Sequence, residues 1–361
     1  MIERWKTVSR KDPEFLSYLE GRFSKEHRAL PVRSLNVDSV MEEVTFEIKP
    51  VAEINRPTSL MVAWQALRPQ SLVFSIAPLL TTFVYCWAHD RQMNPVIMVS
   101  SFVGVLFFHM AVNLFNDYGD HMKGRDRIRS GGGSRVIQKG WLRAVAVKRA
   151  AWILTALALL CGLPAIFLHL APVVIIAGVA GLIGLEFAFQ KARLKYHGWA
   201  EIAAFGLTGP ILCWAFAWTS TGQITLAEGA LGSIFGAISL LFFHSANFEN
   251  IMTDSQAGVR TWATRTGFDA SKKFFYFTAG LTLISSLFYI AAIEREWKLV
   301  PALLTQILFL VPICLRVAGL KSPLASGLTG LRAEPVKLSW LTMIALVSGY
   351  LWIIASRSGG T

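Results

Sequence analysis

Nine apolar stretches, almost free of charge, are long enough to cross a lipid bilayer as helices. A membrane-spanning helix needs about 20 predominantly apolar residues. In chain order the stretches are 71–88, 95–116, 143–168, 172–190, 202–220, 229–247, 274–293, 299–315 and 338–356. The charge-free run 150–185 exceeds one span, and we divide it at 169–172 because Pro172 favours a break in a helix. The pattern therefore predicts an all-α membrane protein, a bundle of nine transmembrane helices.

The first 55 residues differ in kind from the rest of the chain. Positions 1–50 hold nine basic and nine acidic residues and no long apolar run. They show no signal-peptide pattern of charged start, apolar middle and small-residue cleavage site. We interpret residues 1–55 as a cytoplasmic extension with a short helix at 13–28, and residues 56–361 as the membrane domain. A regulatory or partner-binding role for the extension stays open, and no particular protein partner is indicated.

Composition and charge agree with the membrane assignment and predict an orientation. Hydrophobic residues make up 53% of the chain and charged residues 16%, whereas a soluble domain is about one quarter charged. Of the 35 Lys and Arg residues, 31 fall in the N-terminal 70 residues, in the loops after the even-numbered spans, or in the first seven residues of the third span. This asymmetry predicts that the N-terminus lies in the cytoplasm and the C-terminus outside. The net charge of +12 reflects this topology and attraction to anionic lipid, so we predict no nucleic-acid partner.

A cluster of carboxylates stands where the second span ends. This first aspartate region, Asn116–Asp126, reads NDYGDHMKGRD. On a helix, Asn113, Asn116, Asp117 and Asp120 share one face through their i, i+3 and i+4 spacing. Crowded carboxylates at a membrane edge are costly unless cations neutralise them. Mg2+ favours oxygen ligands and commonly bridges carboxylates to phosphate oxygens, so the region predicts a site for a diphosphate.

A second polar stretch follows the sixth span on the same side of the membrane. This second aspartate region, Asn247–Thr261, reads NFENIMTDSQAGVRT. Asp254 is its aspartate, and Asn250 and Glu249 bring further side-chain oxygens, although adjacent helical positions point about 100 degrees apart. Together the two regions predict a membrane-embedded enzyme that acts on a diphosphate.

These motifs resemble those of the UbiA-type intramembrane prenyltransferases. The resemblance runs from about residue 66 onward and includes ALRPQSL, NDYGDHMKGRD, GGSRVIQKG, LKYHGWAEIAAFGLTGP and DSQAGVRTWATRTG. The chain looks most like the branch that prenylates 1,4-dihydroxy-2-naphthoate in menaquinone synthesis, since Gly124 and Asp126 follow that branch's pattern. The resemblance implies nine helices, Mg2+ as cofactor, and prenyl diphosphate and an aromatic acid as substrates. It also implies the bacterial inner membrane, with the active site facing the cytoplasm.

The motifs and the resemblance together give three sets of candidate site residues. The candidate metal ligands are Asn116, Asp117, Asp120, Asp126, Asn250 and Asp254. The candidate catalytic residues are Asp117, Asp120, Arg135 and Arg260. The candidate substrate-binding residues are Asn113, Arg68, Ser134, Lys139, Lys195, Tyr196, Asn247 and Arg265. Guanidinium groups match phosphate oxygens bidentately, but these basic residues could also serve topology alone. Arg68 could meet the acceptor's carboxylate or reach lipid head groups.

Three alternatives remain at this stage. The acceptor could be 4-hydroxybenzoate, homogentisate or another phenol. A nine-span bundle could also be a transporter, although transporters usually place their sites near the midplane and these carboxylates lie at one edge. Finally, the uncharged Asn250 could mark a nonenzymatic protein with a degenerate site. Prenyl transfer to dihydroxynaphthoate is the function that the motifs favour.

Overall fold

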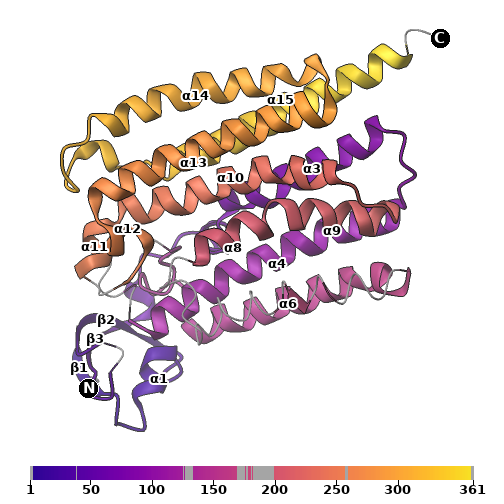
Figure 1. Cartoon of the computed structure of the whole chain (residues 1–361). Coiled ribbons are helices and arrows are strands. Elements are labelled where there is room, and N and C mark those ends of the chain that lie inside the picture. Colours follow the sequence, from indigo (N-terminus) through magenta and orange to yellow (C-terminus); the bar gives the residue numbers. More distant parts are fainter. Residues whose placement is uncertain are drawn as a thin grey trace. The chain divides into compact units, whose positions relative to one another are not determined.

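The computed structural model describes residues 3–37, 39–124, 126, 133–168, 175, 178–179, 181, 199–256 and 259–358 (Figure 1). The described chain forms two compact units. The first contains the described residues within Met1–Pro69 and Phe107–Leu157. The second contains those within Gln70–Leu106, Ala158–Leu182 and Arg193–Thr361.

A small antiparallel sheet begins the first unit. Its strands are β1 (Trp5–Ser9), β2 (His27–Leu35) and β3 (Glu43–Pro50), in the order β1-β3-β2, and helix α1 (Phe15–Glu20) joins the first two. On β3 every second side chain, Val44, Phe46 and Ile48, is buried, as the period of a strand requires. These side chains pack with Val8 and Phe15 in a core of their own.

The sheet corrects two predictions for the N-terminal residues. The description of the chain as all-α is wrong here, because the alternation in EVTFEIK from Glu43 to Lys49 directs one face of a strand into a core. The helix predicted at 13–28 exists only as α1. It ends at Glu20 because Gly21, with φ +72°, adopts the left-handed conformation that terminates helices.

The remainder of the first unit brings three helical segments around one apolar cluster. They are α2 (Ser59–Leu67), the C-terminal part of α4 (Pro95–Met122) and the N-terminal part of α6 (Ala144–Leu168). The side chain of Thr58 caps α2, and Arg68 ends it with φ +53°. The buried cluster consists of Ala66, Ala111, Leu114, Phe115, Val136, Ile137, Ala144, Val147 and Ala151. This packing holds the end of α4 against α2 and the segment around Val136.

The second unit is built from packed helices around α10. Its elements include η2 (Pro69–Leu72), α3 (Val73–Ala88), α8 (Trp199–Leu207), α9 (Pro210–Thr221), α10 (Leu226–Glu249), α11 (Ile251–Gln256), α12 (Trp262–Thr266), α13 (Phe268–Phe288), η4 (Tyr289–Glu294), η5 (Trp297–Leu299), α14 (Val300–Ala318), η6 (Ser326–Leu328) and α15 (Ala333–Ser358). Helix α10 packs against α3, α8, α9, α13 and α15, and it is the central helix of this unit.

Glycines allow the backbone of α10 to lie close to the end of α8 and to the segment that joins α8 to α9. A Cβ on Gly236 would stand 2.5 Å from the carbonyl oxygen of Phe205. One on Gly232 would stand 2.6 Å from the carbonyl oxygen of Gly209. The Gly232–Gly236 spacing is the small-xxx-small pattern that lets membrane helices approach closely.

Eight helical segments among the described residues are long and apolar enough to cross a membrane. They are Pro69–Ala88, Pro95–Met122, Ala144–Leu168, Glu201–Thr221, Leu226–Glu249, Phe268–Glu294, Trp297–Ala318 and Ser326–Ser358. Each overlaps one predicted span. The remaining predicted span, 172–190, lies almost wholly outside the described residues. On α14, Leu308 and Leu315 are largely exposed while Gln306 is buried, the distribution expected of a helix that faces lipid.

Candidate functional site

The first aspartate region places three carboxylates in buried positions. Asp117 and Asp120 lie in the last turns of α4, with exposed fractions of 2% and 4%, and Asp126 is 3% exposed. The side-chain amide of Asn113 donates to the backbone carbonyl of Leu67 at 3.1 Å and thereby joins α4 to the end of α2. Buried carboxylates need positive charge or hydrogen-bond donors nearby.

Asp117 receives both. The guanidinium of Arg68 forms an ion pair with its Oδ1 atom, and the backbone N–H of Ser134 donates to its Oδ2 atom at 3.2 Å. Gln65 in turn donates from Nε2 to the backbone carbonyl of Ser134 at 2.7 Å. We predicted that Arg68 meets an acceptor carboxylate or lipid head groups; in the structure its guanidinium contacts the carboxylate of Asp117.

Gly133 occupies the point where these groups converge. Its φ is +64°, and a Cβ there would stand 3.2 Å from Asp117 Oδ1. The same point is 3.4 Å from both Arg68 Nη2 and Asp126 Oδ2. Two features favour glycine at this position. Its positive φ is strained for other residues, and the charged groups leave little room for a Cβ. The two carboxylates and the guanidinium therefore converge on the space beside Gly133.

The donor set around Gly133 fits a hard divalent cation that arrives with a phosphate group. Mg2+ is usually held by one or two protein carboxylates, with water and substrate phosphate oxygens completing its shell. Asp117 and Asp126 supply two such carboxylates around one point. Within the described part of the chain, no group of three or more His, Cys, Asp or Glu side chains is already placed to hold a metal.

The second aspartate region contains one buried carboxylate. Asp254, in α11, is fully buried, and its backbone N–H donates to the carbonyl of Asn250 at 2.8 Å. The side-chain amide of Asn250 donates to the carbonyl of Ala246 at 2.8 Å, where α10 ends. Glu249 accepts a hydrogen bond from the backbone N–H of Arg332 at 3.1 Å and lies 3.8 Å from its guanidinium. The Glu249 carboxylate is therefore engaged by another segment.

A polar pair that the sequence did not reveal lies within the apolar helices of the second unit. The side-chain amide of Asn247 donates to Glu201 Oε1 at 2.6 Å. Glu201 is buried, and its Oε2 atom has no hydrogen-bond partner among the described residues. Asn247 was a predicted substrate-binding residue. Glu201 stood unnoticed inside the LKYHGWAEIAAFGLTGP block, although a lone carboxylate at the start of an apolar span was its available signal.

The predicted basic residues vary in exposure. Arg135 is half-buried with φ +60°, and Lys139 is exposed, its ammonium 4.3 Å from the ring of Trp141. Arg260 and Arg265 are exposed, and Arg265 lies in the last turn of α12. Their accessible charged groups could meet an anionic ligand, and the roles given to them stay predictions.

Other candidate positions complete the placement. Lys195 and Tyr196 lie outside the described residues, and Asn116 is half-buried on α4. His244 is buried in α10, where its Nε2 atom lies 2.8 Å from the carbonyl of Ser271 and its ring stacks on Phe248. This environment indicates a structural histidine.

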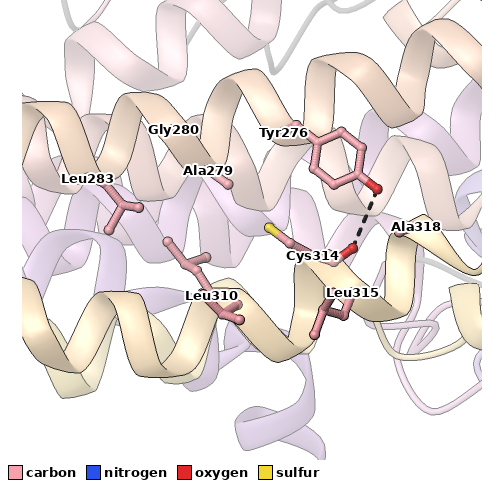
Figure 2. Close-up of a pocket in the computed structure, with 9 residues that line it drawn as sticks. Tyr276, Ala279, Gly280, Leu283, Leu310, Cys314, Leu315 and Ala318 are labelled. Carbon is pink, nitrogen blue, oxygen red and sulfur yellow. Dashed lines mark hydrogen bonds between the residues drawn. The ribbon is translucent and has the colours of Figure 1, made fainter.

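A pocket of about 340 Å³ lies between α13 and α14 in the second unit (Figure 2). Its lining is apolar and includes Leu283, Leu310 and Leu315, and Tyr276 donates from its hydroxyl to the carbonyl of Cys314 at 3.4 Å. None of the candidate site residues that the structure describes lines it, and its lining offers apolar contact.

Comparison with known proteins identifies the class. The model of the UbiA prenyltransferase family matches residues 75–325, and the chain belongs to this family. It is 28% identical over 272 residues to the 1,4-dihydroxy-2-naphthoate octaprenyltransferase of Mycobacterium tuberculosis, covering 74% of this chain and 88% of that protein. It is 25% identical over 251 residues to the enzyme of the same name from Haemophilus influenzae, covering 66% of this chain and 80% of that protein. The resemblance inferred from the motifs is confirmed.

Solved structures give the same fold. A UbiA homolog from Archaeoglobus fulgidus, solved with GPP and Mg2+, superposes with a TM-score of 0.59 at 13% identity, covering 81% of this chain and 99% of that one. The fold and the family together make the chain an integral membrane protein. The prediction that it is an enzyme of the prenyltransferase class is confirmed at the level of the family.

Proposed function

We propose that this protein transfers a polyprenyl group from a prenyl diphosphate to an aromatic acceptor, 1,4-dihydroxy-2-naphthoate, in menaquinone biosynthesis. The observation that carries the proposal is the convergence of Asp117, Asp126 and Arg68 around Gly133. The acceptor is supported by the names of the relatives and by the branch pattern of Gly124 and Asp126.

The residues around Gly133 suit Mg2+ and a diphosphate together. Asp117 and Asp126 would hold the cation, with Asp120 and Asn116 on the same helix end as further oxygen donors. Bound Mg2+ would neutralise the diphosphate and improve it as a leaving group. Arg68 carries a positive charge at the same point. Its guanidinium would stabilise the negative charge that the diphosphate oxygens gain when the allylic C–O bond breaks.

The remaining steps depend on a water-poor surrounding. The allylic cation left by C–O cleavage is attacked by the electron-rich acceptor ring, and apolar helices shield it from water. With dihydroxynaphthoate, the ring carbon forms a bond to the prenyl carbon while its carboxyl group leaves as CO2. We propose that four basic side chains bind the anionic groups of the substrates. They are those of Arg135, Lys139, Arg260 and Arg265.

Asn250 and Asp254 provide a second and weaker metal position in this proposal. Asp254 brings one buried carboxylate, and Asn250 brings only a carbonyl oxygen. Asn113 and Ser134 lie beside the first position and Asn247 beside Glu201, and we assign these polar groups, with Lys195 and Tyr196, to substrate binding.

The proposed topology has nine spans in the bacterial inner membrane, with a cytoplasmic N-terminus and an external C-terminus. The asymmetry of Lys and Arg supports it. Both aspartate regions then face the cytoplasm, and residues 1–55 form a cytoplasmic domain ahead of a membrane domain at 56–361.

The experiment is an assay in membranes with dihydroxynaphthoate, 4-hydroxybenzoate and homogentisate, each against prenyl diphosphates of several lengths. We expect a prenylated, decarboxylated naphthoquinol from the first acceptor, only when Mg2+ is present. Prenylation of another acceptor and not of dihydroxynaphthoate would overturn the acceptor assignment. Absence of transfer to all three would overturn the function.

A further inference from the structure

An N-terminal domain, residues 3–55, stands ahead of the family match that begins at residue 75. It has its own sheet and its own apolar core. The chemistry proposed above uses none of its side chains. Its contacts within the first unit nevertheless lead to the first aspartate region.

The N-terminal domain contacts α4, which carries ligands of that region, and the segment 133–141, which packs beside it. Tyr118, on α4, donates from its hydroxyl to Glu20 Oε1 at 2.8 Å. Trp141, eight residues after Gly133, donates from Nε1 to the carbonyl of Asn55 at 3.0 Å. Next to Trp141, a Cβ on Gly140 would stand only 2.9 Å from side-chain atoms of the domain, so the two surfaces are in close contact.

His121 lies between the domain and the site. It is buried, and its Nε2 atom is 2.9 Å from the backbone carbonyl of Leu19. A carbonyl oxygen only accepts, so Nε2 carries the proton of this hydrogen bond. In the neutral ring Nδ1 is then an acceptor, and the side-chain amide of Gln138 lies 3.4 Å from it.

Gln138 extends this contact to a candidate metal ligand. Its Nε2 atom also donates to Asp126 Oδ2 at 3.2 Å, so the two N–H bonds of one amide serve His121 and Asp126. A continuous hydrogen-bonded chain therefore runs from the Leu19 carbonyl to the carboxylate that faces Gly133. Groups that hold the ligands of a metal commonly set its affinity.

We propose that the N-terminal domain is a positioning element for the first aspartate region, acting through His121 and Gln138 on the orientation of Asp126. The inference rests on the proposed role of Asp126 as a Mg2+ ligand. His121 and Gln138 are positioning residues, since neither touches the reacting groups. The N-terminal domain supplies the Leu19 carbonyl at one end of this series of hydrogen bonds. The Asp126 carboxylate, the proposed Mg2+ ligand, stands at the other end.

Three variants of the full-length protein test the inference. Gln138→Met fills the same volume without donating to Asp126. His121→Asn keeps a polar group near the place of Nδ1 but is too short to reach the Leu19 carbonyl. His244→Asn is the matched control, because His244 is equally buried and makes the same kind of bond to a backbone carbonyl.

The first measurement is binding of Mn2+, in the presence of inorganic diphosphate, followed by electron paramagnetic resonance of the purified proteins. We expect about tenfold weaker binding in Gln138→Met and in His121→Asn, the scale typical of lost outer-shell contacts, and a change below about twofold in His244→Asn. Turnover should show the same split, with a raised KM for Mg2+ and little change in kcat at saturating Mg2+. Amides 134–141 should exchange faster in His121→Asn.

Native Mn2+ affinity in Gln138→Met overturns the inference, and so does native affinity in a folded His121→Asn. An equal loss in His244→Asn also overturns it, because any buried histidine would then have the same effect. If His121→Asn does not fold, Gln138→Met decides, since Gln138 is only half-buried. A native protein without Mg2+-dependent prenyl transfer would instead refute the proposed function.

Discussion

The first and second aspartate regions both lie where a long apolar helix ends, but they differ in charge and in what holds their side chains. The first has three buried carboxylates, and two of them, those of Asp117 and Asp126, converge with the guanidinium of Arg68 beside Gly133. The second has one buried carboxylate, Asp254. The amide of Asn250 is engaged with the helix end, and Glu249 is engaged with Arg332.

This difference indicates that the two regions contribute unequally to the binding of Mg2+. A divalent cation gains most from sites where anionic oxygens already converge, because their mutual repulsion is relieved when it binds. The first region has this property around Gly133. We therefore expect the first region to set the affinity for Mg2+ and diphosphate, and the second to modulate it.

The largest effect should come from removing a carboxylate of the first region. Asp117→Ala and Asp120→Ala should each lower kcat by about a hundredfold or more, the scale seen when a preorganised electrostatic group is lost. Initial rates in membranes at saturating Mg2+ measure this effect. Near-normal rates in either variant would refute the role given to that residue.

Filling the space beside Gly133 should have the next largest effect on catalysis. Gly133→Ala would place a methyl group 3.2–3.4 Å from Asp117, Arg68 and Asp126 and would strain a φ of +64°. We expect the KM for Mg2+ to rise by about tenfold, as for other disturbances of a ligand shell.

The control for this substitution is Gly330→Ala. Gly330 has φ +78° and open space around its Cβ position, so it shares the backbone strain but not the crowding. Its KM for Mg2+ should stay at the native value. Equal effects of the two alanines would mean that backbone strain, and not the converging charges, explains Gly133.

Adding a negative charge to the second region should strengthen its Mg2+ binding and make it more like the first region. Asn250→Asp loses the hydrogen bond to Ala246 but adds an anionic oxygen, and we expect the KM for Mg2+ to fall by about threefold, the effect of roughly 0.7 kcal/mol. A titration of rate against Mg2+ measures it. An unchanged or higher Mg2+ requirement would show that this position is not limited by charge.

The smallest effect should follow Glu249→Gln. The carboxylate faces Arg332, whose side chain is 43% exposed, so its loss should cost under about 1 kcal/mol of stability. Turnover and the KM for Mg2+ should stay close to native. A large rise in the Mg2+ requirement would restore Glu249 as the missing ligand of the second region.

The sequence was sufficient for features that repeat along the chain or stand in one short motif. Eight spans follow from long uncharged runs, because a lipid environment excludes charge over about 20 residues. The roles given to Asp117, Asp120 and Asn250 come from local motifs and stay predictions; the structure adds that Asp117 and Asp120 are buried. The sheet was missed because a short alternation, as in EVTFEIK, was outweighed by the surrounding charges.

Contacts between distant residues could not be predicted in this way. The hydrogen bonds of Gln65 with Ser134 and of Asn247 with Glu201 join residues 69 and 46 positions apart. For Arg68 the sequence suggested the acceptor's carboxylate or lipid head groups, whereas its contact with Asp117 depends on how α2 packs against α4. Local pattern identifies which residues carry charge, and tertiary packing decides which of them meet.

The most direct test of this account is calorimetric titration of geranyl diphosphate into the purified protein, with and without Mg2+, for the native chain, Asp117→Asn and Asp254→Asn. The account predicts Mg2+-dependent binding in the native protein, its loss in Asp117→Asn, and weakened but measurable binding in Asp254→Asn. Equal losses in the two variants, or binding that ignores Mg2+, would contradict it.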